Sequence, residues 1–467
     1  MNYQNTPKRS RIGILFTAVT VILVLAAAAV MLLNHYGILD QLLGDTPTES
    51  IPETTVTIPT TQATTVATES PTTEPTTEPT TAPTEPFVVS TASVGVTGDV
   101  LMHSPVYNAY RTGNDTFDFT DVFRYIGGYY EQYDLMVANM EGTLSGAAAG
   151  YSGYPKFNCP DGIAVGLKNA GVDMLLYANN HTYDRAHSGF IRTQEVIRNA
   201  GLQVLGIRES EDLPFYTIQD INGIRVGMVC YTYATENTPD GCKTLNGNPV
   251  SKADGPLIAT FQYNNLDAFY GEMEQTLAAM YEDGAEATML YIHWGDEYRR
   301  EQNAVQQEMA QTLCELGVDV IVGGHPHVIQ PFEMLTSATG HKTYCIYSLG
   351  NALSNQRRQD MRLARQGHTE DSMIFSVTFE KWNDGSVNVC DVNILPIWVS
   401  KEWNGKNVYY ILPLDISLES WDIYNIGSKS YAELFESYRR TMEIVGPGLN
   451  ACREAMGLAP VPLTFPA

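Results

Sequence analysis

Two histidines stand one residue apart in the segment Ile-Val-Gly-Gly-His325-Pro-His327, directly after a run of apolar, β-branched residues. Other apolar runs also end in Asp, Glu, Asn or His, and these polar ends are Asp99, Glu141, Asn180-His181 and His293. Oxygen and imidazole ligands without a thiolate suit a divalent cation such as Mn, Fe or Zn. The pattern predicts a hydrolytic centre that holds two divalent metal ions.

The residue types allow a division of labour within such a centre. Two cations about 3.5–4 Å apart activate water and stabilise an anionic transition state, and they need a bridging carboxylate. Glu141 is well placed to bridge, and Asp99 and His327 would complete one metal. The second metal would be completed by Asn180, His293 and His325. His181 could donate a proton to the leaving group or bind a substrate oxygen.

Each of these residues, taken alone, also has an ordinary structural explanation. Asp99 after a glycine could cap a turn, Glu141-Gly142 could be a surface turn, and Asn179-Asn180 is turn-prone. A lone histidine such as His293 is more often half-buried and hydrogen-bonded than a ligand. Because five polar strand ends occur in one domain, we favour a shared site over five separate structural roles.

The elements that must position these residues alternate between strand and helix. Strands are expected at 94–97, 135–139, 174–178, 226–232, 288–293, 318–322, 343–348, 373–379, 387–392 and 394–399. Helices are expected at 162–170, 187–200, 266–282 and 305–316, each followed by a glycine that favours a C-cap. This alternation predicts a layered α/β fold, in which ligands bind at the carboxyl ends of the strands. The strand-rich stretch 343–399 should add a second, partly antiparallel sheet, and 421–467 should form a C-terminal extension with a helix near 431–443.

The first 87 residues predict an anchor and a stalk. Residues 12–33 are uncharged and almost wholly apolar, about the length of a membrane span. Lys8, Arg9 and Arg11 precede this run, which predicts a cytoplasmic N-terminus at 1–11 and an extracellular remainder. A cleaved signal peptide is the alternative. Residues 34–87, rich in Thr, Pro and Glu, predict a disordered stalk, and the main domain follows at 88–420.

Composition excludes some partners. The formal net charge of −25 argues against nucleic acid, because its binding depends on Lys and Arg. The seven cysteines are scattered singly, without CxxC pairs or metal-type spacing. We expect them mainly as buried apolar residues, although Cys230 and Cys242 are near enough in sequence to form a disulfide.

The motifs, in their order along the chain, resemble the CapA family of capsular poly-γ-glutamate synthesis, within the calcineurin-like metallophosphoesterase superfamily. The residues that carry the resemblance are Gly98-Asp99, Asn139-Met-Glu141-Gly, Ala178-Asn-Asn-His181 with Asp184, His293-Trp-Gly295 with Glu297, Gly324-His-Pro-His327 and Ser348-Leu-Gly-Asn351. The resemblance implies a four-layer αββα sandwich with a dinuclear site. It also implies that Asp184, assigned to catalysis with His181, orients a metal ligand.

Some positions depart from the superfamily pattern. The first motif usually reads Asp-x-His, whereas the nearest histidine here is His103, four residues after Asp99, which makes it a further candidate ligand. Asn351 is assigned to substrate binding. After it, Arg358 and Arg362 fall on one face of a possible helix with Arg365. This segment could be a solvated surface helix, or its guanidinium groups could grip an anionic substrate.

These inferences predict a single-pass cell-membrane protein with an extracellular, metal-dependent hydrolase domain of phosphoesterase or amide-hydrolase type. The resemblance implies partners in an anionic cell-surface polymer such as poly-γ-glutamate and in other membrane proteins of capsule synthesis. The alternative is a polymer-binding or export-assembly component whose metals bind carboxylates without turnover.

Overall fold

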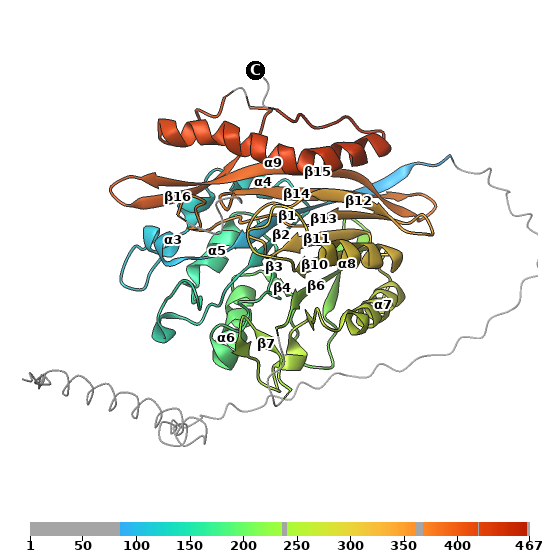
Figure 1. Cartoon of the computed structure of the whole chain (residues 1–467), viewed down its shortest axis with the longest axis horizontal. Helices are drawn as coiled ribbons and strands as arrows, with labels where there is room; N and C mark the ends of the chain where they lie inside the picture. The colour runs from blue at the N-terminus through green and yellow to red at the C-terminus, as the bar shows by residue number, and fades with distance from the viewer. Residues whose placement is uncertain (1–84, 236–240, 361–367, 419, 465–467) are drawn as a thin grey trace, which may run out of the picture. The chain divides into compact units, whose positions relative to one another are not determined.

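The computed structural model describes residues 85–235, 241–360, 368–418 and 420–464. These residues form two large sheets with helices against them (Figure 1). The prediction of a mixed α/β fold with helices flanking its sheets is confirmed.

The first sheet carries the ends that present Asp99 and Glu141. Its order is β16 (Asn407–Pro413), β15 (Val387–Trp403), β14 (Asp371–Trp382), β1 (Val88–Val100), β2 (Leu135–Met140), β3 (Met174–Leu176) and β4 (Gln203–Leu205). Strands β1 to β4 run parallel, so their carboxyl ends meet at one edge. The other three strands extend the sheet antiparallel from β1.

The second sheet presents the histidines. Its order is β12 (Phe332–Thr336), β13 (Lys342–Ile346), β11 (Val320–Gly324), β10 (Ala287–His293), β6 (Ile224–Tyr233) and β5 (Tyr216–Ile221), with β9 (Thr260–Phe261) also beside β6. Its central strands β6, β10, β11 and β13 are parallel. A small hairpin pairs β7 (Thr244–Leu245) with β8 (Asn248–Pro249).

Strand alternation explains how the sheets stack. On β2, Leu135 and Val137 point into a core shared with β6, β10 and β11, whereas Met136 and Ala138 pack on the opposite face under helices. The helices are α3 (Ser104–Ala109), α4 (Gly127–Tyr130), α5 (Gly162–Asn169), α6 (Ala186–Asn199), α7 (Leu266–Glu282), α8 (Ala304–Glu315) and α9 (Ser428–Ala455). Helices α5 and α6 cover the first sheet, and α7 and α8 cover the second.

Strands in the stretch 343–399 do not form a sheet of their own, contrary to the expectation. Strand β13 pairs parallel with β11, whereas β14 pairs antiparallel with β1. The two halves of this stretch therefore join two different sheets. Apolar periodicity identifies a strand but carries little information about its pairing partner.

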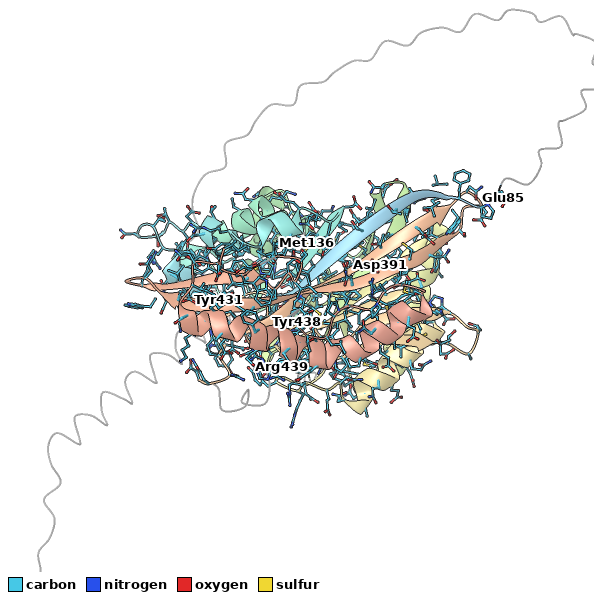
Figure 2. The ribbon with its side chains drawn as sticks, turned by 90° about the horizontal axis from the view of Figure 1, so that it is seen from above. Glu85, Met136, Asp391, Tyr431, Tyr438 and Arg439 are labelled. Carbon is cyan, nitrogen blue, oxygen red and sulfur yellow. The ribbon has the colours of Figure 1, made fainter. Side chains whose placement is uncertain are left out.

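Helix α9 continues twelve residues beyond the expected end near Glu443, through Pro447. A proline inside a helix removes one hydrogen bond and costs about 3 kcal/mol. Burial of Val445, Leu449 and Cys452 on the strands offsets that cost. The helix packs on β15 and β12, and Figure 2 shows it running beside β15, the strand that carries Asp391. Arg440 fixes the helix through two bonds to the buried Asp371, at 2.7 and 2.8 Å.

This seat for α9 gives a stability prediction. A Cβ added at Gly448 would lie 1.9 Å from the carbonyl oxygen of Phe332 on β12. We expect Gly448→Ala to lower the free energy of unfolding by about 1–3 kcal/mol. Gly271→Ala in α7, where a Cβ would meet nothing within 4 Å, should instead raise it by roughly 0.5–1 kcal/mol. Urea unfolding of both variants checks the pair, and equal effects would contradict the close approach.

The proposed anchor at 12–33, nearly all of the stalk at 34–87, and Arg362 and Arg365 lie outside the described residues. Within the described ranges, no helix is both long and apolar enough to cross a membrane. Of the cysteines, Cys159, Cys230, Cys314, Cys345 and Cys452 are buried free thiols.

Candidate metal centre

The polar strand ends of both sheets meet at one place. Asp99 and Glu141 come from β1 and from the residue after β2, while His293 ends β10 and His325 follows β11. Asp99 is aimed by a bulge, because the register of β1 on β2 shifts between Thr97 and Asp99. All four side chains are buried.

Two groups of possible ligand atoms share Glu141. One group is Glu141, His293 and His325, the other is Asp99, Glu141 and His327, and the atoms within each group lie within 4.8 Å of one another. Asn180 joins the first group, since its Oδ1 lies 3.0 Å from His293 Nε2. The structure thus brings together every residue predicted as a primary ligand, in the predicted grouping.

The surroundings of Glu141 fit a cation. Its side chain is fully buried, and neither carboxylate oxygen has a hydrogen-bond partner. Burying an unpaired carboxylate costs several kcal/mol. Burial raises the pKa of Glu141 well above its usual range, His327 opposes the rise, and Asp99 adds to it. A carboxylate that lacks donors but faces imidazoles is suited to metal coordination.

The imidazoles have contrasting electrostatics. Burial, followed by the neighbouring histidines, lowers the pKa of His293 and of His325 well below the usual value, so both are neutral and can offer a lone pair. Burial also opposes a charge on His327, but Glu141 and Asp99 outweigh it and raise its pKa to about 9. The two carboxylates thus favour a positive charge at the position of His327.

The His-Pro-His turn has an unusual backbone. His325 has φ of 96° and His327 has φ of 58°, values that non-glycine residues rarely adopt. Such conformations cost about 1–3 kcal/mol each and concentrate at functional sites. Here they direct both rings toward Glu141, with His327 Nε2 at 3.8 Å from Oε1.

Amide side chains hold the ligands in place. Asn139 donates to Asp99 Oδ1 at 2.8 Å, and Asn179 in turn donates to Asn139. The Asn351 Oδ1 lies 3.0 Å from His327 Nδ1, and its amide group donates to three acceptors, among them the carbonyl oxygen of His327. Asn351 is fully buried, and its bonds orient His327. Its assignment to substrate binding stays a prediction.

Replacing this asparagine should weaken metal binding without removing a ligand. We expect Asn351→Ala to lower metal affinity by roughly 10–100-fold, because removing a residue that orients a metal ligand typically has an effect of this size. Metal titration of the purified protein measures it. Asn450→Ala removes two bonds to Val461 on the far-lying C-terminal segment and should leave metal affinity unchanged. Equal losses in both variants would mean that the effect is general destabilisation.

His181 and Asp184 form a pair beside the ligands. Asp184 Oδ2 lies 2.7 Å from His181 Nδ1 and also accepts from the backbone N–H of Phe157. This contact leaves Nε2 of His181 on the side of Glu141, 4.0 Å from Oε1. The arrangement presents one ring nitrogen to whatever binds at the centre, and both predicted roles of His181, proton donor and substrate-oxygen ligand, stay predictions.

Two other candidates lie apart from the ligand groups. His103 is in neither group; its Nδ1 lies 3.2 Å from the carbonyl oxygen of Leu101, and burial followed by His327 lowers its pKa to about 4. Arg358 lies in a turn and reaches toward His368 and Glu433 of α9, so its described contacts are not with the ligands.

Sequence reasoning missed the aromatic residues around the centre. The Tyr233 ring lies 4.9 Å from that of His325, and the Tyr298 ring lies 5.9 Å from that of His327. The ring of Phe157 meets His181 edge-on at 4.8 Å. Tyr233 could have been found from the sequence, because it ends an apolar strand just as the ligands do. Tyr298 and Phe157 lie in loops, where no such pattern marks them.

The fold and site define a mixed α/β protein with a buried candidate centre for divalent metal ions between two sheets. Residues 93–356, more than half of the chain, match the family model described as "Bacterial capsule synthesis protein PGA_cap", and the chain belongs to that family. This confirms the CapA resemblance.

Relatives agree with this membership. The chain is 27% identical over 301 residues to the capsule biosynthesis protein CapA of Bacillus anthracis, covering 59% of this chain and 64% of that one. It is 23% identical over 315 residues to the PGA biosynthesis protein CapA of Bacillus subtilis (strain 168), covering 65% and 71%. The match thus spans just under two thirds of the first relative's length.

Solved structures give weaker matches. A hypothetical protein of Thermus thermophilus matches at 14% identity and a TM-score of 0.36, covering 65% of this chain and 98% of that one. The NAD nucleotidase NadN of Haemophilus influenzae matches at 13% identity and a TM-score of 0.39, covering 76% and 63%.

Proposed function

We propose that this protein is a membrane-anchored, extracellular hydrolase that uses two divalent metal ions to process an anionic capsular or cell-wall polymer. The observation that carries the proposal is the pair of ligand groups sharing Glu141, with His181 Nε2 facing the same carboxylate. The names of the relatives support poly-γ-glutamate as the polymer. We assign the fold to the four-layer αββα sandwich of metallophosphoesterases.

The residues divide into holding and reacting roles. Asp99, Glu141 and His327 would hold one ion, and Glu141, Asn180, His293 and His325 the other. Bound ions of the Mn, Fe or Zn type supply Lewis acidity and make water a competent nucleophile at neutral pH. His181 gives a proton to the leaving group from Nε2, because Asp184 keeps the other ring nitrogen engaged.

The chain before the domain supports the proposed location. Residues 12–33 have the length and composition of a membrane span, with the basic residues on the N-terminal side. The Thr/Pro/Glu-rich segment would hold the domain away from the bilayer, within reach of a surface polymer and of other membrane proteins of capsule synthesis.

A substrate panel tests the proposal on the full-length protein. Phosphodiesters, γ-glutamyl amides and γ-linked oligoglutamate are assayed after chelation and after return of Mn, Fe or Zn. We expect turnover of at least one class, lost on chelation and restored by one of the ions. Retained metal with no turnover of any class would overturn the hydrolase and favour the non-catalytic polymer-binding role.

A further inference from the structure

A hollow of about 520 Å³ lies between helix α9, the loop after β10 and the segment before β14. It is lined by arginines from all three elements: Arg300, Arg358, Arg439 and Arg440. Its volume falls in the range of ordinary ligand sites. A concentration of guanidinium groups is unexpected in a chain with a formal net charge of −25.

Three of the four guanidinium groups are available to a ligand. Arg300 is exposed and makes no ion pair within the described residues, and Arg358 contacts Glu433 only at 3.8 Å. Arg439 projects from α9 (Figure 2) and pairs with Glu436 and Glu443 of its own helix. Such exposed pairs contribute only about 0.3–0.5 kcal/mol and exchange readily. The fourth, Arg440, is held by the buried Asp371.

His368 lies among the arginines of the hollow. Arg358 Nη1 lies 3.2 Å from Nδ1 of His368, which also lines the hollow. Burial, followed by the fields of Arg440, Arg358, Arg300 and Arg439, lowers the pKa of His368 to about 3. His368 is therefore neutral and adds no charge of its own to the hollow that it lines together with the four arginines.

Two separate segments connect this hollow to the metal centre. Tyr298, whose ring lies against His327, precedes Arg300 by two residues. Gln356, which donates to the Tyr298 hydroxyl at 3.2 Å and accepts from Asn351, precedes Arg358 by two residues. Two residues of extended chain span at most about 7 Å. The hollow is thus next to the centre, and each segment contributes one residue to the surroundings of the centre and one arginine to the hollow.

We propose that this arginine hollow is a binding subsite for the pendant carboxylates of a polyanionic chain whose neighbouring unit lies at the metal centre. This inference rests on the proposed polymer substrate, and it assigns recognition of that polymer to the arginines of the hollow. Guanidinium groups bind carboxylates through paired hydrogen bonds. Glu301, Glu436 and Glu443 also line the hollow, so a single carboxylate should bind there only weakly. A chain that carries several linked carboxylates should bind more tightly, because each bound group raises the effective concentration of the next.

The test is equilibrium binding of γ-linked oligoglutamate to the full-length protein in chelator, where turnover is absent. We expect Arg300→Gln/Arg358→Gln to weaken binding at least about tenfold, since each charged hydrogen bond is worth roughly that factor. The matched control is Arg124→Gln/Arg198→Gln, which removes two exposed arginines paired on other surfaces and should keep wild-type affinity.

Each other outcome has a definite meaning. Equal affinity for the two double variants, or no binding by the wild type, would overturn the subsite. Equal binding of inorganic polyphosphate would overturn its assignment to carboxylates. Binding that is intact and arginine-dependent, in a protein that hydrolyses nothing, would leave the subsite standing and refute the hydrolase, so the two proposals fail separately.

Discussion

Replacing Glu141 with glutamine is expected to abolish tight binding at both metal positions at once. Both ligand groups contain this carboxylate, with His293 Nε2 and His327 Nε2 each 3.8 Å from its Oε1. An amide keeps the shape but removes the charge that attracts and bridges two cations. We expect loss of both ions in elemental analysis and a fall in activity beyond the roughly 100-fold seen when only an orienting partner is lost.

The same variant should also change the response to chelation. A ligand present at 100 times its dissociation constant stabilises a protein by about 2.7 kcal/mol, so chelation should lower the melting temperature of the wild type but not of Glu141→Gln. In chelator the variant should be at least as stable as the wild type, because it buries no unpartnered carboxylate.

Glu286→Gln is the matched control. Glu286 lies just before β10, at the end opposite His293, and it pairs with Lys381 at 2.6 Å. The variant Glu286→Gln should have nearly the wild-type free energy of unfolding and an unchanged metal content. Retention of one equivalent of metal by Glu141→Gln would mean that the two positions do not share this residue, and the bridging role would then be wrong.

The centre was predictable because its geometry follows from a simple rule. Asp99, Glu141, His293 and His325 each follow an apolar run, and parallel strands bring such ends to one edge. The helices were predictable for a similar reason, since periodicity and a following glycine locate them. Gly201 and Gly317 have φ of 81° and 94°, as their predicted C-cap positions require.

What sequence reasoning missed depends on contacts between distant segments. The role of Asn351 arises from its bond to His327, and the strands β13 and β14 separate into two sheets through pairings far along the chain. Arg358 is a similar case, because its neighbours Arg300 and Arg439 come from a loop and from α9. Local pattern indicates which residues are polar or apolar, whereas partners are set by the complete packing.

Replacing His181 with alanine should separate chemistry from metal binding. Loss of a general acid typically lowers the rate by about 10²–10⁴-fold. The imidazole is held by Asp184 at 2.7 Å and belongs to neither ligand group, so both ions should remain. The fall should be large for substrates with poor leaving groups, such as alkyl phosphodiesters or γ-glutamyl amides. It should be small for nitrophenyl esters, whose leaving groups need no proton.

Asp184→Asn and His187→Ala complete the comparison. The asparagine would remove the negative charge that stabilises the imidazolium of His181, the form that carries the acidic proton on Nε2, so it should show the same dependence on the leaving group with a smaller loss. His187 is also held through Nδ1 by an aspartate, Asp254 at 2.9 Å, but its side chain is 67% exposed and makes no described contact with the centre. Its removal should leave turnover unchanged. A rate loss in His181→Ala that is the same for all leaving groups would show that the imidazole binds substrate oxygen instead. The strength of such a binding contact does not depend on the basicity of the leaving group.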